Sequence, residues 1–148
     1  MIPIAAYLAP ARIADLRAAT RDDAIAEVCS FLAAVPAVAD LASFRRAVLD
    51  RERELSTGIG LGIAVPHAKV AAVGDFVLAL GRSRAGIEWQ ALDGRPVHLV
   101  VLIAGPEGRQ ARYLQVLASV TLRLKDEGVR RDLLAAPGPA EMLALLSR

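Results

Sequence analysis

The sequence predicts an α/β fold, a three-layer α/β/α domain around a mixed β-sheet. Short apolar segments of strand length and segments of helical periodicity follow one another in the order strand, two helices, three or four strands, then helices. The two most apolar segments lack the alternation of a strand with one face in water, so helices are expected on both faces of the sheet. Because 148 residues, 55% of them hydrophobic, suffice for one core, residues 1–148 are expected to form a single domain.

The first part of the chain predicts one strand and two helices. Residues 13–16 are a short apolar segment before a polar break and form the candidate first strand. Thr20 lies three residues before Asp23, as in a capping box with aspartate in place of glutamate, and Pro36 ends the helix that follows. Asp40 can cap the second helix. The exposed side of that helix is expected to carry its charged residues: Arg45, Arg46, Asp50, Arg51, Glu52, Arg53 and Glu54.

The middle of the chain predicts the sheet. A glycine-rich turn over residues 56–62 (STGIGLG) precedes a short strand over residues 63–65, which Pro66 terminates. Residues 75–80 and 97–104 are the apolar segments expected as central strands, and residues 87–89 between them are a candidate edge strand.

Helical periodicity returns after the last predicted strand. Four apolar residues share one helical face: Tyr113, Leu117, Val120 and Leu124. Residues 129–135 and 140–146 predict two shorter closing helices, because the Pro-Gly-Pro sequence over residues 137–139 separates them. These helices supply one outer layer of the predicted fold.

Composition excludes several classes of protein and site. The longest apolar run, residues 97–104, is far short of the roughly 20 residues of a membrane span, and the N-terminus lacks the order of a signal peptide, so a cytoplasmic protein is expected. A single cysteine, Cys29, excludes an internal disulfide and a cysteine-rich zinc site. A net charge of +2 and 4% aromatic residues argue against nucleic-acid binding. The chain has two histidines, so any histidine chemistry uses His67, His98 or both.

The segment over residues 51–69 carries the residue types that handle a phosphoryl group. Backbone N–H groups of a glycine-rich turn can converge on an anion, and Ser56 and Thr57 add hydroxyl donors. Arg51 offers a planar, permanently charged guanidinium. His67, directly after Pro66, offers an imidazole nucleophile on a stiff backbone. The segment is neither a Walker A loop nor a dinucleotide-binding fingerprint.

This segment resembles the phosphorylation-site signature of the enzyme IIA domains of the bacterial phosphotransferase system (PTS), type 2, the fructose, mannitol and nitrogen class. The match runs without a gap from Glu52 through Ile59-Gly60 to Ile63-Ala64-Val65-Pro66-His67-Ala68. Three further pieces look like the family: Arg51-Glu52, Gly86-Ile87-x-Trp89 and Asp93-Gly94-x-Pro96-Val97. The resemblance therefore covers nearly the whole chain, and the family's fold agrees with the predicted order of elements.

The resemblance implies a phosphocarrier mechanism without a metal or other cofactor. His67 accepts a phosphoryl group from the phosphohistidine of the carrier HPr and passes it to a cysteine of a IIB domain. Arg51 stabilises the charge, and Ser56, Thr57, Gly58 and Gly60 are the expected phosphate-binding residues. Many relatives carry a second histidine where this chain has Tyr113, whose hydroxyl can donate a hydrogen bond to the phosphoryl group but cannot become cationic.

Several alternatives stay open at the level of sequence. The absence of fused IIB or IIC sequence favours a free-standing regulatory protein of the nitrogen type, which binds partner proteins according to its phosphorylation state. Tyr113 is equally consistent with a functional residue and with a core residue. In place of a second histidine it fits either a retuned site with slower transfer or a scaffold that has lost efficient catalysis. His98 is expected to be a strand histidine with a satisfied hydrogen bond rather than a catalytic partner. Alanine-rich helix faces favour a homodimer, and the sugar, if any, is not encoded in this domain.

Overall fold

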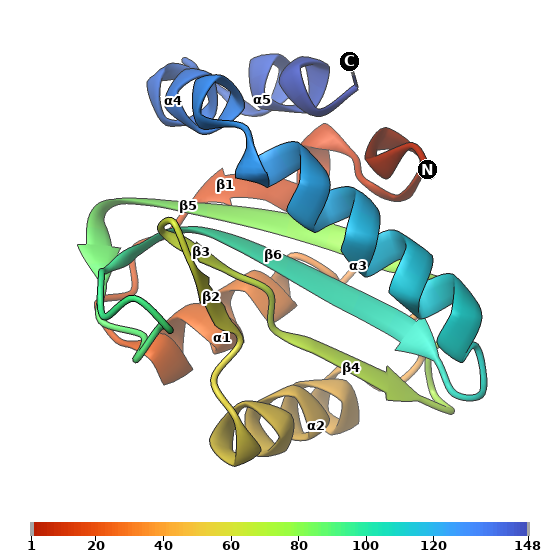
Figure 1. Ribbon diagram of the computed structural model, residues 1–148. Helices are drawn as coiled ribbons and strands as arrows, with labels where there is room; N and C mark the ends of the chain where they lie inside the picture. Colours follow the sequence, from red (N-terminus) through yellow and green to blue (C-terminus); the bar gives the residue numbers. More distant parts are fainter. Residues whose placement is uncertain (1, 148) are drawn as a thin grey trace.

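A computed structural model describes residues 2–147, which contain a six-stranded mixed sheet with the order β1-β5-β6-β3-β2 (Figure 1). The strands are β1 (Ile13–Asp15), β2 (Gly58–Gly60), β3 (Ile63–Ala64), β4 (His67–Val70), β5 (Val77–Ile87) and β6 (Val97–Pro106). β6 runs antiparallel to β5, whereas β3 and β4 follow each other along its other edge, both parallel to it. This arrangement confirms the predicted mixed sheet.

Helices cover both faces of the sheet, as predicted (Figure 1). One face carries α1 (Arg21–Ser30) and α2 (Leu41–Glu54). The other carries α3 (Gln110–Lys125), α4 (Glu127–Ala135) and α5 (Pro139–Leu146), together with the short 3₁₀ turns η1 (Ile4–Tyr7) and η2 (Pro10–Arg12). The expected caps are present, because the side chains of Thr20 and Asp40 accept hydrogen bonds from the first turns of α1 and α2 at 3.3 and 3.0 Å.

Two hydrophobic cores lie on opposite faces of the sheet and share its central strand. Val100, Leu102 and Ala104 of β6 pack towards α1 and α2. Leu99, Val101 and Ile103 of the same strand pack towards α3, α4 and α5. Alternate side chains of a strand point to opposite faces, so the uninterrupted apolar segment reflects burial on both sides.

The strand predicted over residues 75–80 and the edge strand predicted over residues 87–89 are wrong as separate elements. β5 runs continuously from Val77 to Ile87, through a polar stretch between the two predicted strands. Arg82 in this stretch is 2% exposed because it donates to Asp15 at 2.6 Å and to the carbonyls of Leu133 and Ala136, each at 2.8 Å. Long-range partners thus make a charged residue acceptable inside a strand.

The other corrections concern the ends of elements. α1 ends at Ser30, and turns replace its predicted continuation towards Pro36. Pro66 does end β3, but the chain resumes strand geometry at once as β4, which the sequence analysis did not predict. β4 places His67 opposite Ile103 and Lys69 opposite Gly105, near the carboxyl end of β6. The strand therefore positions the candidate site between α2 and the first turns of α3.

Candidate functional site

His67 begins β4 and is half-buried, with its Nδ1 atom 3.0 Å from the carbonyl oxygen of Val65. A carbonyl oxygen only accepts hydrogen bonds, so this contact assigns the proton of the neutral ring to Nδ1. The lone pair that remains for a nucleophile is then on Nε2. Pro66 lies between the two contacting residues and restricts the backbone that sets this geometry.

Tyr113 in the first turns of α3 lies against His67, with the two ring centroids 5.1 Å apart and the planes at 36°. Tyr113 is 5% exposed and belongs to the core beneath α3. Burial raises the pKa of Tyr113, and the charge of Arg51 partly opposes this increase. The hydroxyl therefore remains a hydrogen-bond donor at neutral pH. Tyr113 is therefore both a core residue and a direct neighbour of the histidine.

Arg51 in the last turn of α2 supplies a positive charge to the same place. The residue is half-buried, and its guanidinium donates from Nη1 to the carbonyl of Leu55 at 3.1 Å. Its charge lowers the pKa of both His67 and Tyr113. The structure thus brings the predicted residues Arg51, His67 and Tyr113 together, and Arg51 is not a member of a fully solvated charged face.

Glu52 is a correction to the expected exposed face of the second helix. It is 2% exposed, and its carboxylate accepts from the Thr57 N–H and hydroxyl, both at 2.6 Å, and from the Trp89 Nε1–H at 3.1 Å. Thr57 in turn accepts at its carbonyl from Val65 N–H, 3.0 Å away. Glu52 therefore connects the end of α2, through Thr57, to Val65. The carbonyl of Val65 is the one that contacts the imidazole of His67.

Ser56, Thr57 and Gly58 of the glycine-rich loop make hydrogen bonds within the protein. Both donors of Thr57 point to Glu52, and the Ser56 hydroxyl donates to the carbonyl of Trp89 at 3.3 Å and accepts from Gly58 N–H at 3.1 Å. A Cβ atom at Gly58 would lie 2.8 Å from Ala91, so a close backbone approach requires glycine there. Phosphate binding by Ser56, Thr57 and Gly58 stays a prediction.

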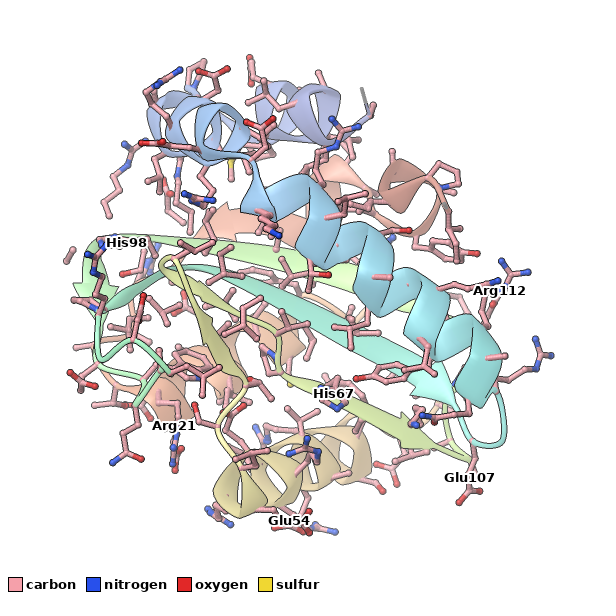
Figure 2. The ribbon with its side chains drawn as sticks, in the orientation of Figure 1. Arg21, Glu54, His67, His98, Glu107 and Arg112 are labelled. Carbon is pink, nitrogen blue, oxygen red and sulfur yellow. The ribbon has the colours of Figure 1, made fainter. Side chains whose placement is uncertain are left out.

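Gly60 and His98 are not brought to His67. Gly60 pairs with Ile63, which lies opposite Leu99, four residues along β6 from the partner of His67. His98 lies at the other end of the sheet, as Figure 2 shows, and its Nδ1 is 2.8 Å from the carbonyl of Ser83. The expectation of a strand histidine with a satisfied hydrogen bond is confirmed.

Three residues of the site were missed or undervalued from sequence. The charge pattern of the second helix predicts Glu52 on the solvent side, and no local pattern assigns a role at the site to Trp89 or Lys69. Lys69 could have been found had β4 been predicted, because residues two apart on a strand share a face and Lys69 follows His67 by two.

Within residues 2–147 the structure contains no helix long and apolar enough to cross a membrane.

Replacement of Glu52 by alanine is expected to destabilise the fold by about 2–3 kcal/mol, because three buried donors lose their acceptor. Unfolding in urea can be followed by the fluorescence of Trp89, the only tryptophan of the chain. The matched control is Glu54→Ala on the exposed side of the same helix, with a change within about 0.5 kcal/mol. Equal stability of the two variants would contradict the buried network.

Comparison with known proteins agrees with the resemblance. The fructose-specific EIIABC component of Bacillus subtilis is 36% identical over 128 residues, covering 86% of this chain but only 20% of that protein. The nitrogen regulatory protein of Bradyrhizobium diazoefficiens is 29% identical over 147 residues, covering 99% of this chain and 95% of that protein. The chain thus spans a fifth of one relative and nearly all of the other.

Solved structures show the same fold. The nitrogen regulatory protein IIA-Ntr of Neisseria meningitidis superposes with a TM-score of 0.90 at 26% identity, over 97% of this chain and 98% of that one. Enzyme IIA mannitol of Escherichia coli, solved in complex with phosphorylated enzyme IIB mannitol, superposes with a TM-score of 0.80 at 28% identity. The superposition covers 93% of this chain and 95% of that one. Because the family model of the phosphoenolpyruvate-dependent sugar phosphotransferase system, EIIA 2, matches residues 11–148, this chain belongs to the type 2 enzyme IIA family.

Proposed function

We propose that the chain is a phosphocarrier whose nucleophile is Nε2 of His67. The observation that carries this proposal is the contact of Nδ1 with the Val65 carbonyl, beside Arg51 and Tyr113. With Nδ1 held as the donor, Nε2 points its lone pair away from the backbone that fixes the ring. A histidine in this state is a competent acceptor for a phosphoryl group.

Transfer moves one phosphoryl group between two nitrogens and then to sulfur. The donor is the phosphohistidine of an HPr-type carrier: its N–P bond breaks, its imidazole keeps the electron pair, and a new bond forms from Nε2 of His67 to phosphorus. In the second step a cysteine thiolate of a IIB domain attacks phosphorus, and Nε2 recovers its lone pair. The transition state is loose, so the protein acts mainly by positioning and by neutralising charge.

Arg51 and Tyr113 have distinct roles in this proposal. Arg51 provides a permanent positive charge for the phosphoryl oxygens, and its guanidinium can donate two parallel hydrogen bonds. Tyr113 orients the imidazole through its ring and offers a neutral hydroxyl donor. The partner in the second step is proposed from the mannitol relative, whose structure contains the phosphorylated IIB enzyme.

The test of the proposed function is phosphorylation of the wild-type chain by enzyme I, HPr and phosphoenolpyruvate. Intact-protein mass should rise by one phosphoryl group, and the attached phosphoryl group should be acid-labile, as expected for a phosphohistidine. Addition of the cognate IIB domain should then remove this group. Absence of any mass increase with the cognate HPr would overturn the proposal.

A regulatory function of the nitrogen type is the second candidate. The observation in its favour is coverage, because the Bradyrhizobium nitrogen regulatory protein and this chain match over nearly their whole lengths. Affinity capture with unphosphorylated and phosphorylated protein should then recover different partners. Identical partners from wild-type and His67→Ala protein, under phosphorylating conditions, would count against a phosphorylation-dependent regulator.

The pKa of His67 is expected to lie below the ordinary value of about 6.5. Burial lowers it, with the charges of Arg51 and Lys69 acting in the same direction, against the Val65 carbonyl and Glu52. Because the neutral ring is the nucleophile, the protein should still accept a phosphoryl group below pH 6.5. The folded protein should also lose stability as the pH is lowered from the unfolded to the folded pKa of His67, because the unfolded chain binds the proton first.

An NMR titration of the His67 ring proton measures this pKa directly. The same resonance in urea-unfolded protein gives the reference value. A folded midpoint at or above the unfolded one would show that burial and the two cations do not control the ring.

A further inference from the structure

Lys69 is a second cation at the His67 site. It lies two residues after His67 on β4, so the two side chains leave the same face of the strand. Its Nζ atom is 4.4 Å from the centroid of the Tyr113 ring, the ring that also contacts the imidazole. Nζ also donates to the side-chain oxygen of Gln110 in the first turn of α3.

The contacts of Lys69 hold the ammonium without neutralising it. Within residues 2–147 no carboxylate lies at ion-pair distance from Nζ, and its two partners are an amide oxygen and an aromatic face. A cation over a tyrosine ring is attracted by the ring quadrupole, which restricts a flexible side chain but leaves its charge in place. The positive charge of Lys69 reaches the imidazole, because it lowers the pKa of His67.

The phosphorylated site needs more positive charge than Arg51 alone supplies. A phosphoryl group carries about two negative charges at neutral pH. Tyr113 cannot contribute a positive charge, and burial raises its pKa, so its hydroxyl stays neutral. Lys69 is the other cation that acts on His67, and it approaches from the side of α3 where Tyr113 lies.

We propose that Lys69, seated on the Tyr113 ring, is a catalytic residue that supplies the second positive charge to the phosphoryl group on His67. This inference rests on the proposed phosphocarrier function. During transfer the ammonium turns from the Gln110 oxygen to a phosphoryl oxygen, and no bond of Lys69 is made or broken. Tyr113 then acts as the platform that keeps this lysine beside the imidazole.

The test compares single-turnover phosphorylation rates at saturating phospho-HPr, so that weaker docking does not affect the result. Lys69→Met should slow phosphorylation roughly 10- to 100-fold, because a preorganised charge is lost from the transition state. Lys69→Arg should recover most of that loss. The matched control, Lys125→Met at the exposed end of α3, should leave the rate unchanged. Urea unfolding followed by Trp89 fluorescence verifies that the variants are folded.

A double substitution separates charge from structure. In a Tyr113→His background, a histidine that can become cationic replaces the neutral ring, so Lys69→Met should there cost less than about threefold. Three results would overturn the proposal: a Lys69→Met rate within twofold of wild type, equal losses in Lys69→Met and Lys69→Arg, or the same loss in both backgrounds. Failure of the wild-type chain to be phosphorylated would instead refute the phosphocarrier function.

Discussion

Substitution of His67 by glutamine is expected to abolish phosphorylation of the chain. The glutamine amide is similar in reach to imidazole and can hydrogen-bond to the Val65 carbonyl, but its nitrogen has no nucleophilic lone pair. Intact-protein mass after incubation with enzyme I, HPr and phosphoenolpyruvate measures the result. We expect complete conversion of the wild-type chain and no mass increase for the variant.

The chain provides its own matched control, because it contains only two histidines. His98 lies at the other end of the sheet, with its Nδ1 engaged by the Ser83 carbonyl (Figure 2). His98→Gln should therefore be phosphorylated at the wild-type rate. A mass increase in the His67→Gln variant, or its loss only in the His98→Gln variant, would refute the assignment of Nε2 of His67.

Substitution of Arg51 by methionine is expected to slow phosphorylation of His67 by about 10²- to 10³-fold, since a fixed charge is lost from the transition state. Methionine keeps much of the apolar stem of arginine, so the packing of α2 on β4 should survive. The measurement is the single-turnover rate at saturating phospho-HPr. Arg51→Lys should fall between the two, because an ammonium keeps the charge but not the planar pair of donors.

Arg53 is the control for Arg51, because it lies in the same final turn of α2 but its side chain is 60% exposed and pairs with Asp22 and Asp50. Arg53→Met should leave the rate within about twofold of wild type, as expected for a solvated surface charge. Equal effects of the two substitutions would mean that α2 contributes only a diffuse positive field. A decrease that disappears when phospho-HPr is saturating would place Arg51 in partner binding rather than in transfer.

Tyr113, at the position where the family resemblance implies a second histidine, takes part in both site proposals. Tyr113 retains the ring contact with His67 and adds a ring face for the Lys69 ammonium. In the proposed mechanism the site combines one nucleophile with cations from two elements, Arg51 of α2 and Lys69 of β4. This combination favours a site that has changed its source of charge over a scaffold that has lost its chemistry.

Most of the fold followed from local patterns. Capping residues, prolines and apolar periodicity placed the five helices and the main strands, because these signals act over a few residues. The strand ends were less predictable. β5 continues through Arg82 because Asp15, Leu133 and Ala136 lie beside it in space. No sequence pattern near Arg82 predicts those partners.

The candidate site divides in the same way. The sequence by itself determined the family signature, and it places the proposed nucleophile His67 and the neighbouring charge of Arg51 within the same continuous segment. Only the tertiary structure decided that Glu52 is buried and accepts hydrogen bonds from three donors. It also decided that the Lys69 ammonium lies over the ring of Tyr113. These contacts join residues of different elements, so they depend on how helices pack against the sheet, which local sequence patterns do not specify.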